Sequence, residues 1–268
     1  MAAQSPLITV MQKAVEKAAR SLAHDFGEVE QLQVSRKGPG DFVSQADIQA
    51  ERLLRQELQR ARPDYGFLME ESAEIPSKDG RHRWIIDPLD GTTNFLHGIP
   101  HFAISVALEK EGDLIAGVVH NPVTHENFWA ERGAGAYLND RRLRVSGRSD
   151  LTSAVIGTGM PFIGVGDHPA YLAKLAPVMA ATSGVRRMGA AALDLAFVAA
   201  GRFDAYFEYG LKPWDVAAGI LLVREAGGFV TEINGAKGLI TSPNFLAGSA
   251  NMHGPLMKLL QNNPGLKR

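Results

Sequence analysis

Residues 87–95 read Asp-Pro-Leu-Asp-Gly-Thr-Thr-Asn-Phe and directly follow the apolar residues 84–86. The apolar residues predict a buried strand, which presents the next side chains at the edge of a sheet. Proline fixes one backbone angle, so the turn is able to hold the carboxylates of Asp87 and Asp90 toward one point. The carbonyl of Leu89 is then a third oxygen in the same place.

Gly91 and the residues after it add a feature that suits phosphate. Glycine permits close approach of the backbone, and Thr92-Thr93-Asn94 resembles the start of a helix. The free N–H groups at such a start are able to receive a phosphate.

Two further acidic clusters accompany this motif: Glu70-Glu71, after a predicted strand, and Asp215, after Trp214. Carboxylates gathered without a basic neighbour repel one another unless a cation is bound, which predicts a metal site. The chain has no cysteine, and its eight histidines show no ligand-like spacing. The oxygen ligands therefore favour Mg2+ or Mn2+ over zinc or copper, and two nearby ions would activate water and stabilise a leaving oxygen.

Each cluster also has a structural interpretation when it is taken alone. Asp87-Pro and Asp90-Gly are common turns, Asp215 is placed to cap the helix after it, and Glu70-Glu71 suits a solvated strand end. Their combination favours the metal site, since the phosphate-loop, dinucleotide-binding and nucleophile-elbow motifs are absent from the sequence.

His97 and His101 lie four residues apart, a spacing that suits two metal ligands on one helix. The Gly-Ile-Pro sequence between them excludes a helix. Packing or loop roles are therefore favoured for both.

The first half of the chain predicts two helices. Apolar residues recur at helical spacing over residues 8–22, and a second helix is expected over 44–60, where Ser44 and Asp47 resemble a capping box. The apolar face of the second helix would consist of Ile48, Leu54 and Leu58.

The polar stretch over residues 36–41 is interpreted as a loop, and residues 67–145 contain short strand patterns separated by turn residues. The first half, 1–145, is thus predicted to be an antiparallel sheet with two helices packed on it. The second half, 146–268, alternates helices, expected over 168–181, 189–201 and 215–228, with strands, expected over 203–208 and 229–233. This alternation implies a mixed sheet covered by helices. Because the linker over 146–150 is short, the halves should pack as one compact unit.

Composition excludes several classes of partner. The formal net charge of -1 gives no general reason to bind nucleic acid or an anionic membrane. The N-terminus lacks a signal-peptide pattern, and no stretch approaches the roughly 20 apolar residues of a membrane span. We therefore expect a soluble, cytoplasmic protein that acts on a small molecule or a protein.

These motifs resemble those of the inositol monophosphatase family. Residues 87–95 are similar to its D-P-[IL]-D-G-T-[TS]-N-F signature, and residues 213–219 are similar to its W-D-x-A-A-G signature. Supporting similarity is found in three further segments: Asp41–Asp47, Glu70-Glu71-Ser72, and Asn121-Pro122 with Phe128-Trp129-Ala130. The resemblance implies an α+β fold, a five-layered αβαβα sandwich of the sugar phosphatase type, and a homodimer.

The resemblance also implies an activity, which is Mg2+-dependent hydrolysis of small phosphomonoesters such as myo-inositol monophosphate by metal-activated water. It implies two or three ions, with Mn2+ as an alternative, and inhibition by Li+. The implied metal ligands are Glu70, Asp87, the Leu89 carbonyl, Asp90 and Asp215.

Catalytic roles are implied for Glu70, Thr92, Asp47 and Lys37, the last in a glycine-flanked loop where a solvated lysine is an equal alternative. The implied contacts to substrate are Asp90, Gly91, Thr92, Thr93, Gly189, Ala190, Ala191, Glu208 and Asp215. A solvated strand end is the alternative for Glu208.

Two departures from the family pattern affect these expectations. Met69 replaces a common glycine, and it should point away from Glu70. Ala190 replaces a common hydroxyl residue, which removes one polar contact to substrate. The alternatives are fructose 1,6-bisphosphate, histidinol phosphate or a 3'-phosphonucleotide as substrate, and a binding role with the transcription machinery, which some bacterial members have.

Overall fold

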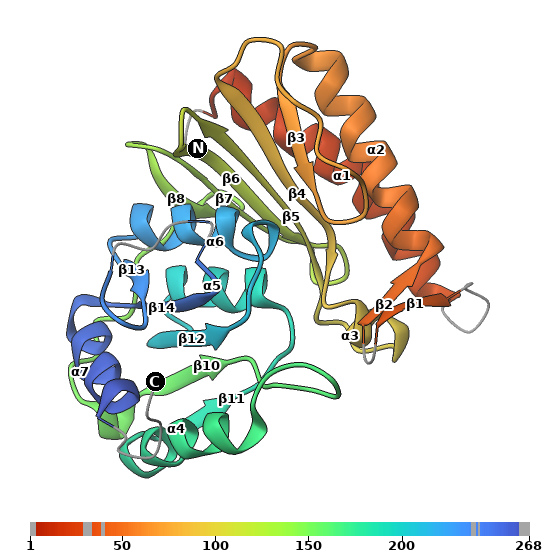
Figure 1. Cartoon of the computed structure of the whole chain (residues 1–268). Coiled ribbons are helices and arrows are strands. Elements are labelled where there is room, and N and C mark those ends of the chain that lie inside the picture. Colours follow the sequence, from red (N-terminus) through yellow and green to blue (C-terminus); the bar gives the residue numbers. More distant parts are fainter. Residues whose placement is uncertain (1–3, 29–33, 39–40, 237–239, 241, 263–268) are drawn as a thin grey trace.

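The computed structural model describes residues 4–28, 34–38, 41–236, 240 and 242–262, which form two main β-sheets with helices on their faces (Figure 1). The larger sheet places β3 to β9 in chain order. Its neighbouring strands are antiparallel, as predicted, except β3 and β4, which are parallel because residues 70–81 return the chain to the same end. The strands are β3 (Gly66–Met69), β4 (His82–Asp90), β5 (Ala103–Lys110), β6 (Asp113–Asn121), β7 (Glu126–Glu131), β8 (Gly135–Leu138) and β9 (Arg141–Arg142).

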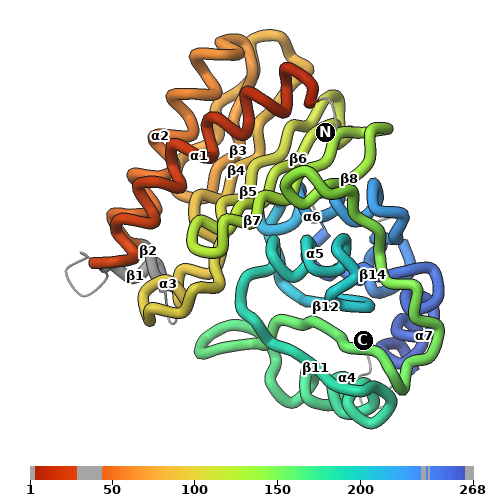
Figure 2. Tube along the Cα trace, turned by 180° about the vertical axis from the view of Figure 1, so that it is seen from behind, coloured from red at the N-terminus to blue at the C-terminus, as the bar shows by residue number. Residues whose placement is uncertain are grey.

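Helices α1 (Pro6–Gly27) and α2 (Gln45–Ala61) cover one face of this sheet (Figures 1 and 2). Both helices were predicted, and Ser44 with Asp47 forms the expected capping box at the start of α2. The predicted apolar face is wrong at Ile48, which is 47% exposed. The buried stripe instead repeats every four residues and leaves Ile48 outside it; its members are Ala46, Ala50, Leu54 and Leu58.

A two-stranded hairpin replaces the loop that was predicted over residues 36–41. Strands β1 (Val34–Gly38) and β2 (Asp41–Ser44) pair antiparallel. The mostly polar residues of both strands concealed them, and residues 39–40 between them lie outside the described part of the chain.

The smaller sheet has the order β11-β10-β12-β14-β13. Strands β11, β10 and β12 are parallel, and β14 and β13 run antiparallel to their neighbours, so the sheet is mixed as predicted. Its strands are β10 (Val155–Thr158), β11 (Gly184–Arg186), β12 (Ala205–Tyr209), β13 (Phe229–Glu232) and β14 (Asn244–Gly248). The sequence interpretation included β12 and β13 only, because the other three strands are short and lack clear alternation.

Helices lie on both faces of the smaller sheet. The outer face packs against α4 (His168–Ala181), which was predicted, and α7 (Ala250–Gln261), which was not. The inner face packs against α5 (Ala191–Ala199) and α6 (Pro213–Glu225), which also contact the larger sheet. The layers therefore follow the predicted order, helix, sheet, helix, sheet, helix (Figure 2).

Two glycines allow the central layer to pack closely. A Cβ at Gly117 of β6 would lie 3.0 Å from the Cα of Ala218 in α6, and one at Gly219 would lie 2.5 Å from the Cβ of Leu195 in α5. Helix α6 therefore approaches the larger sheet and the adjacent helix α5 more closely than larger side chains would permit.

The division of the chain at residues 145 and 146 stays a prediction. Strand β9 of the larger sheet ends at Arg142, and β10 of the smaller sheet begins at Val155. In the part of the chain that the structure covers, no helix combines the length and the hydrophobicity needed to cross a bilayer.

Candidate active site

The end of β4 carries a β-bulge that turns two acidic side chains. Asp87 pairs with Ser105, and Asp90 pairs with Ala103, so β4 has one more residue than β5 between these pairs. Asp87 is 2% exposed, and its Oδ1 accepts a hydrogen bond from the Leu89 N–H at 2.9 Å. The turn interpretation of Asp87 is thus correct as well, and it holds the carboxylate in one orientation.

Gly91 connects this bulge to the short helix α3 (Thr92–Leu96). Its φ of 89° is in the left-handed region, and a Cβ would lie 3.1 Å from the His101 carbonyl oxygen. The hydroxyl of Thr92 lies 3.0 Å from the Leu89 carbonyl oxygen and 3.2 Å from Oδ1 of Asp47. Thr92 therefore joins the acidic turn to the start of α2.

Asp47 is fully buried at the start of α2. Its Oδ2 accepts hydrogen bonds from the backbone N–H and the hydroxyl of Ser44. Burial raises the pKa of Asp47, and the Ser44 hydrogen bonds oppose this shift. The residue thus caps α2 and faces Thr92 at the same time.

Glu70 and Glu71 follow β3, beside the end of β4. The Glu70 N–H donates to the Ile86 carbonyl at 3.2 Å, and the Glu71 N–H donates to Oε2 of Glu51 at 2.8 Å. The Ser72 hydroxyl donates to Oε1 of the same Glu51. A buried carboxylate of α2, 3% exposed, therefore holds the turn that carries Glu70.

Sequence reasoning missed Glu51, although a signal was present. Glu51 lies four residues after Asp47, so the two carboxylates share one face of α2. Both point into the protein beside the predicted acidic clusters.

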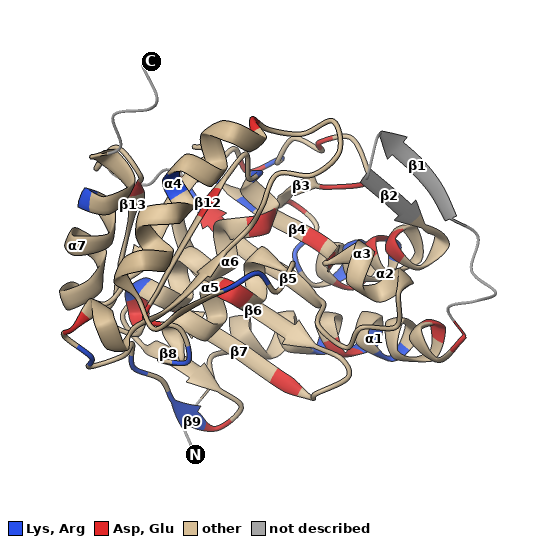
Figure 3. Ribbon diagram, turned by 90° about the horizontal axis from the view of Figure 1, so that it is seen from below, with Lys and Arg blue, Asp and Glu red and all other residues tan. Residues whose placement is uncertain are grey.

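The four predicted acidic ligands interact electrostatically. Burial raises the pKa of Asp87 well above its usual value, and Glu70, Asp90 and Asp215 raise it further. Burial also raises the pKa of Asp90 well above its usual value, with added contributions from Asp215, Glu208 and Glu70. The fold thus brings together side chains from three distant segments, and Figure 3 shows acidic segments at β4 and β12 in red.

Asp215 caps a helix and also interacts with the acidic cluster. It lies in the first turn of α6, where its Oδ2 accepts a hydrogen bond from the Lys212 N–H at 2.7 Å. It also raises the pKa of Asp87 and of Asp90. Capping the helix therefore orients the carboxylate without removing it from the acidic cluster.

The donor set suits a hard divalent cation. Carboxylates that raise one another's pKa are stabilised in the charged form by a cation, and the Leu89 carbonyl adds a neutral oxygen. Within the described ranges, no three Asp, Glu or His side chains are already arranged around one point. The fit to Mg2+ therefore rests on the oxygen chemistry and the mutual repulsion of the acids.

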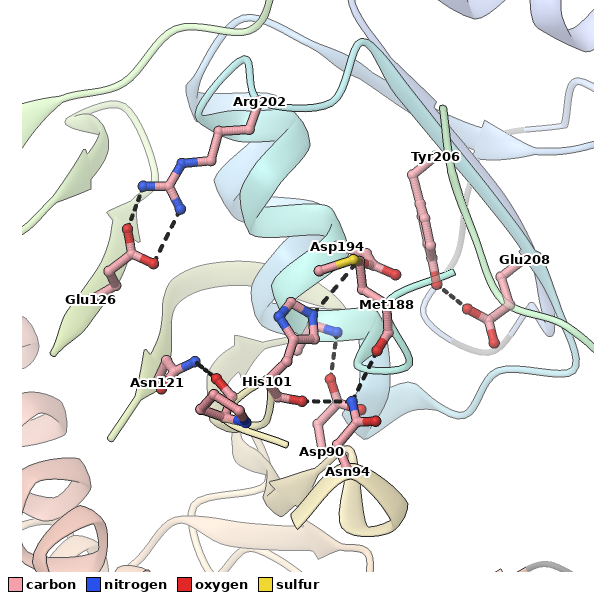
Figure 4. Close-up of polar contacts among 12 residues, drawn as sticks. Asp90, Asn94, His101, Asn121, Glu126, Met188, Asp194, Arg202, Tyr206 and Glu208 are labelled. Carbon is pink, nitrogen blue, oxygen red and sulfur yellow. Dashed lines mark hydrogen bonds and ion pairs between the residues drawn. The ribbon is translucent and has the colours of Figure 1, made fainter. Parts of the chain in front are cut away.

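Some of the residues expected to meet substrate come from the second half of the chain and lie beside Asp90 and Asn94 of the first half (Figure 4). The Ala192 N–H donates to Oδ2 of Asp90 at 2.7 Å. The Asn94 side-chain amide donates to the carbonyl oxygens of His101, at 2.7 Å, and Met188, at 2.9 Å. These bonds hold the segment 189–191 beside the acidic turn.

Glu208 lies within β12, beside this segment, and the solvated strand end suggested as its alternative is not what the structure shows. Its side chain is partly buried, and Oε2 accepts a hydrogen bond from the Tyr206 hydroxyl. Burial raises the pKa of Glu208 to about 7, while the Tyr206 hydrogen bond and the Arg187 charge oppose the shift.

The two histidines considered as metal ligands do not join the acidic cluster. His97 is exposed and its Nδ1 lies 2.8 Å from the Thr93 carbonyl oxygen, whereas Nε2 of His101 lies 3.9 Å from Oδ1 of buried Asp194. Both histidines are thus loop or packing residues, as favoured from the sequence. The side chain of Lys37 lies outside the described part of the structure.

Comparison with known proteins places the chain in one family. The model of the inositol monophosphatase family matches residues 3–264. An inositol-1-monophosphatase of Rhizobium meliloti is 58% identical over 97% of each chain. A protein of Pseudomonas aeruginosa named Nus factor SuhB is 42% identical over 98% of this chain and 99% of its own length.

Solved structures agree with this placement. The extragenic suppressor protein suhB of Bartonella henselae is 55% identical, covers 98% of this chain and all of its own, and superposes with a TM-score of 0.94. An IMPase/NADP phosphatase complexed with Mg2+ and phosphate is 25% identical, covers 98% of this chain and 96% of its own, and has a TM-score of 0.82. The chain belongs to the inositol monophosphatase family, whose members are Mg2+-dependent phosphatases.

Proposed function

We propose that this phosphatase hydrolyses myo-inositol monophosphate to inositol and phosphate. The observation that carries the proposal is the electrostatic coupling of Asp87 to Glu70, Asp90 and Asp215 beside the Asp90–Ala192 contact. This arrangement joins a cation-dependent acidic cluster to the segment expected to meet a sugar-like ring. The relatives named inositol-1-monophosphatase, at 56–58% identity, support the same substrate.

Two ions, with a third more loosely held, would occupy the acidic cluster. Glu70, Asp87 and the Leu89 carbonyl would hold the first, and Asp87, Asp90 and Asp215 the second, with Mn2+ as an alternative to Mg2+. When bound, the ions supply an activated water and neutralise charge that develops on phosphate.

The protein's own groups would orient the attacking water and the phosphate. The Thr92 hydroxyl, which lies between Asp47 and the Leu89 carbonyl, is placed to hold that water together with Glu70. Asp47 would receive the hydrogen of Thr92 and so fix the direction of its lone pairs. The backbone around Gly91, with Thr92 and Thr93, would contact the phosphate oxygens.

The substrate's hydroxyl groups would meet the second half of the chain. Asp90, Asp215 and Glu208 are the proposed acceptors, and the segment Gly189-Ala190-Ala191 would lie against the ring. Ala190 is buried at the start of α5 and supplies no hydroxyl, so recognition rests on the carboxylates.

A phosphatase assay with Mg2+ across inositol, sugar, nucleotide and amino-alcohol phosphates tests this substrate. We expect inositol monophosphate to have the highest kcat/KM. A higher value for fructose 1,6-bisphosphate, histidinol phosphate or a 3'-phosphonucleotide would reject inositol monophosphate while retaining the phosphatase activity.

A transcription-associated role is the second candidate, favoured by relatives named Nus factor SuhB at 40–42% identity. A pull-down from lysate with and without Mg2+ separates the roles. Stable capture of transcription components would support the binding role, and their absence under both conditions would reject it.

We also propose that the protein forms a homodimer through the side of the smaller sheet that ends in β11. This edge strand borders a groove of about 300 Å³ lined by Met160, Met179 and Val185. Ile163, in the loop before α4, is 70% exposed. Analytical ultracentrifugation should show a dimer that Ile163→Glu weakens; a monomeric wild-type protein would reject the proposal.

A further inference from the structure

Tyr206 and Glu208 form a buried hydrogen-bonded pair on β12. Residues two apart on a strand point to the same face, and the Tyr206 hydroxyl donates to Oε2 of Glu208 (Figure 4). The Tyr206 side chain is fully buried, so its hydroxyl does not hydrogen-bond to solvent in place of Glu208.

The neighbouring strand β10 leaves space for this pair. Gly157 pairs with Tyr206, and a Cβ there would lie 2.7 Å from the ring of Phe203 and 3.2 Å from that of Tyr206. At Gly159 a Cβ would lie only 1.9 Å from Cδ of Glu208. Two glycines therefore allow the tyrosine and the carboxylate to pack against the backbone of β10.

This packing restricts the carboxylate. The backbone at Gly159 lies against one side of Glu208, and the Tyr206 hydroxyl occupies Oε2. The terminal torsion of a glutamate is otherwise broad, so its two oxygens would exchange places. The Tyr206 hydrogen bond leaves Oε1 as the oxygen that is available to another donor.

We propose that Tyr206 is a specificity-determining positioning residue, whose hydroxyl fixes Glu208 so that a single carboxylate oxygen faces a ring hydroxyl of the substrate. The inference rests on the proposed role of Glu208 in substrate recognition. Tyr206 donates to Glu208 and is not among the residues assigned to phosphate or metal, so we expect it to act through Glu208.

Tyr206→Phe tests this role because it removes the hydroxyl and keeps the ring. We expect KM for inositol 1-phosphate to rise about tenfold, since an unrestrained carboxylate must be ordered when the substrate binds. The kcat for this substrate should stay within about twofold. With p-nitrophenyl phosphate, which has no ring hydroxyl, KM and kcat should both stay within about twofold.

Tyr171→Phe is the matched control. Tyr171 is also buried, and its hydroxyl is hydrogen-bonded to Thr158 at 2.8 Å instead of to Glu208. Tyr171→Phe should leave KM and kcat unchanged for both substrates. Its agreement with wild type would show that losing a buried tyrosine hydroxyl is not sufficient to change selectivity.

A cycle with Glu208→Gln gives a second measurement. If Tyr206 acts through Glu208, the double variant should have the inositol 1-phosphate KM of Glu208→Gln alone. A double variant whose KM rises by the product of the two single-variant increases would overturn the proposal. So would an unchanged KM in Tyr206→Phe, or an equal rise in KM for inositol 1-phosphate and p-nitrophenyl phosphate.

The assignment of inositol monophosphate as the substrate is tested separately from the role of Tyr206. Wild-type turnover of p-nitrophenyl phosphate without turnover of inositol 1-phosphate would reject inositol monophosphate as the substrate. The same variants would then be compared on the hydroxyl-bearing phosphate that the assay ranks first, with the same outcomes deciding the role of Tyr206.

Discussion

The backbone N–H of Ala192 donates to Oδ2 of Asp90 across a separation of 102 residues in the chain. Asp90 is the last residue of β4, and Ala192 belongs to the first turn of α5. The bond lowers the pKa of Asp90, in opposition to burial and to the neighbouring carboxylates. An acid of one sheet is therefore oriented by a helix that the other sheet carries.

Cation dependence is the first prediction. Turnover should be absent in EDTA and return with Mg2+, because the proposed site has no covalent nucleophile to act in its place. Added Mg2+ should also raise the melting temperature, since it binds the folded acidic cluster. Millimolar Li+ should inhibit, as is general in the family. Full turnover in EDTA would contradict the mechanism.

Asp90→Asn should separate activity from stability. We expect kcat to fall on the order of a thousandfold, since a metal's electrostatic contribution is several kcal/mol. The melting temperature of the metal-free variant should rise by about 3 °C at pH 7, because one repelling charge is lost. Calorimetry in EDTA checks this, with exposed Asp140→Asn as the control.

The expected rise in the melting temperature of Asp90→Asn follows from the raised pKa of Asp90 in the folded protein. Between the unfolded and folded pKa values the folded state binds more protons, so wild-type stability falls as the pH rises through that interval. The asparagine variant lacks this contribution. Near-normal kcat would reject the metal assignment, and a lower melting temperature would reject the repulsion.

Glu208→Gln should alter recognition with little change in kcat. We expect KM for inositol monophosphate to rise about ten- to a hundredfold, corresponding to roughly 1–3 kcal/mol for a charged hydrogen bond. The substrate ranking should become flatter. Glu232→Gln, in the neighbouring part of the same sheet, is the control, because Glu232 accepts from Asn234.

Glu208 should also give KM a dependence on pH. Because burial raises the pKa of Glu208 to about 7, the charged acceptor predominates only above that pH. KM for inositol monophosphate should therefore fall between about pH 6 and 8 relative to KM for p-nitrophenyl phosphate. The same relative KM measured for Glu208→Gln should be flat; a persistent slope would assign it to another group.

Glu51→Gln should weaken cation binding. The Glu71 N–H and the Ser72 hydroxyl donate to separate oxygens of Glu51, and glutamine replaces one of these oxygens by an NH2 group, so one of the two acceptors is lost. The turn that carries Glu70 should lose its orientation, and we expect the Mg2+ concentration for half-maximal activity to rise about fivefold. Glu57→Gln, on the same helix but paired with Lys17, should leave it unchanged.

Lys37→Ala tests the last catalytic assignment made from the sequence. If Lys37 positions water or metal, kcat should fall about tenfold and the Mg2+ requirement should change. Lys13→Ala, at an exposed position of α1, is the control. Unaltered rate and Mg2+ requirement would leave Lys37 as a solvated lysine.

The sequence predicted the parts of the fold that local chemistry determines. Long periodic segments such as α1 and α2, and the turn with a proline between Asp87 and Asp90, follow from spacing and turn residues. The hairpin β1–β2 was missed because its residues are polar. Strands β10 and β11, with 4 and 3 residues, are too short for a periodic pattern.

The partners within the site were harder to predict than its acids. The spacing of Glu51 from Asp47 is visible in the sequence, but its contact with the turn after β3 is seen only in the fold. Tyr206 is recognisable only when β12 lies beside β10. No local pattern specifies such encounters between distant segments, since they depend on how the layers stack.

The close packing at Gly117 and Gly219 makes the position of α6 a condition for catalysis. Helix α6 carries Asp215 toward acids that the larger sheet holds, and Mg2+ accepts little variation around 2.0–2.1 Å from each oxygen. One added methyl group at Gly117 would push α6 away from the larger sheet, and one at Gly219 would push it away from α5, so either would displace Asp215. A relative that keeps every carboxylate but has a bulkier residue at either position would therefore hold its metal ligands too far apart to act as a phosphatase.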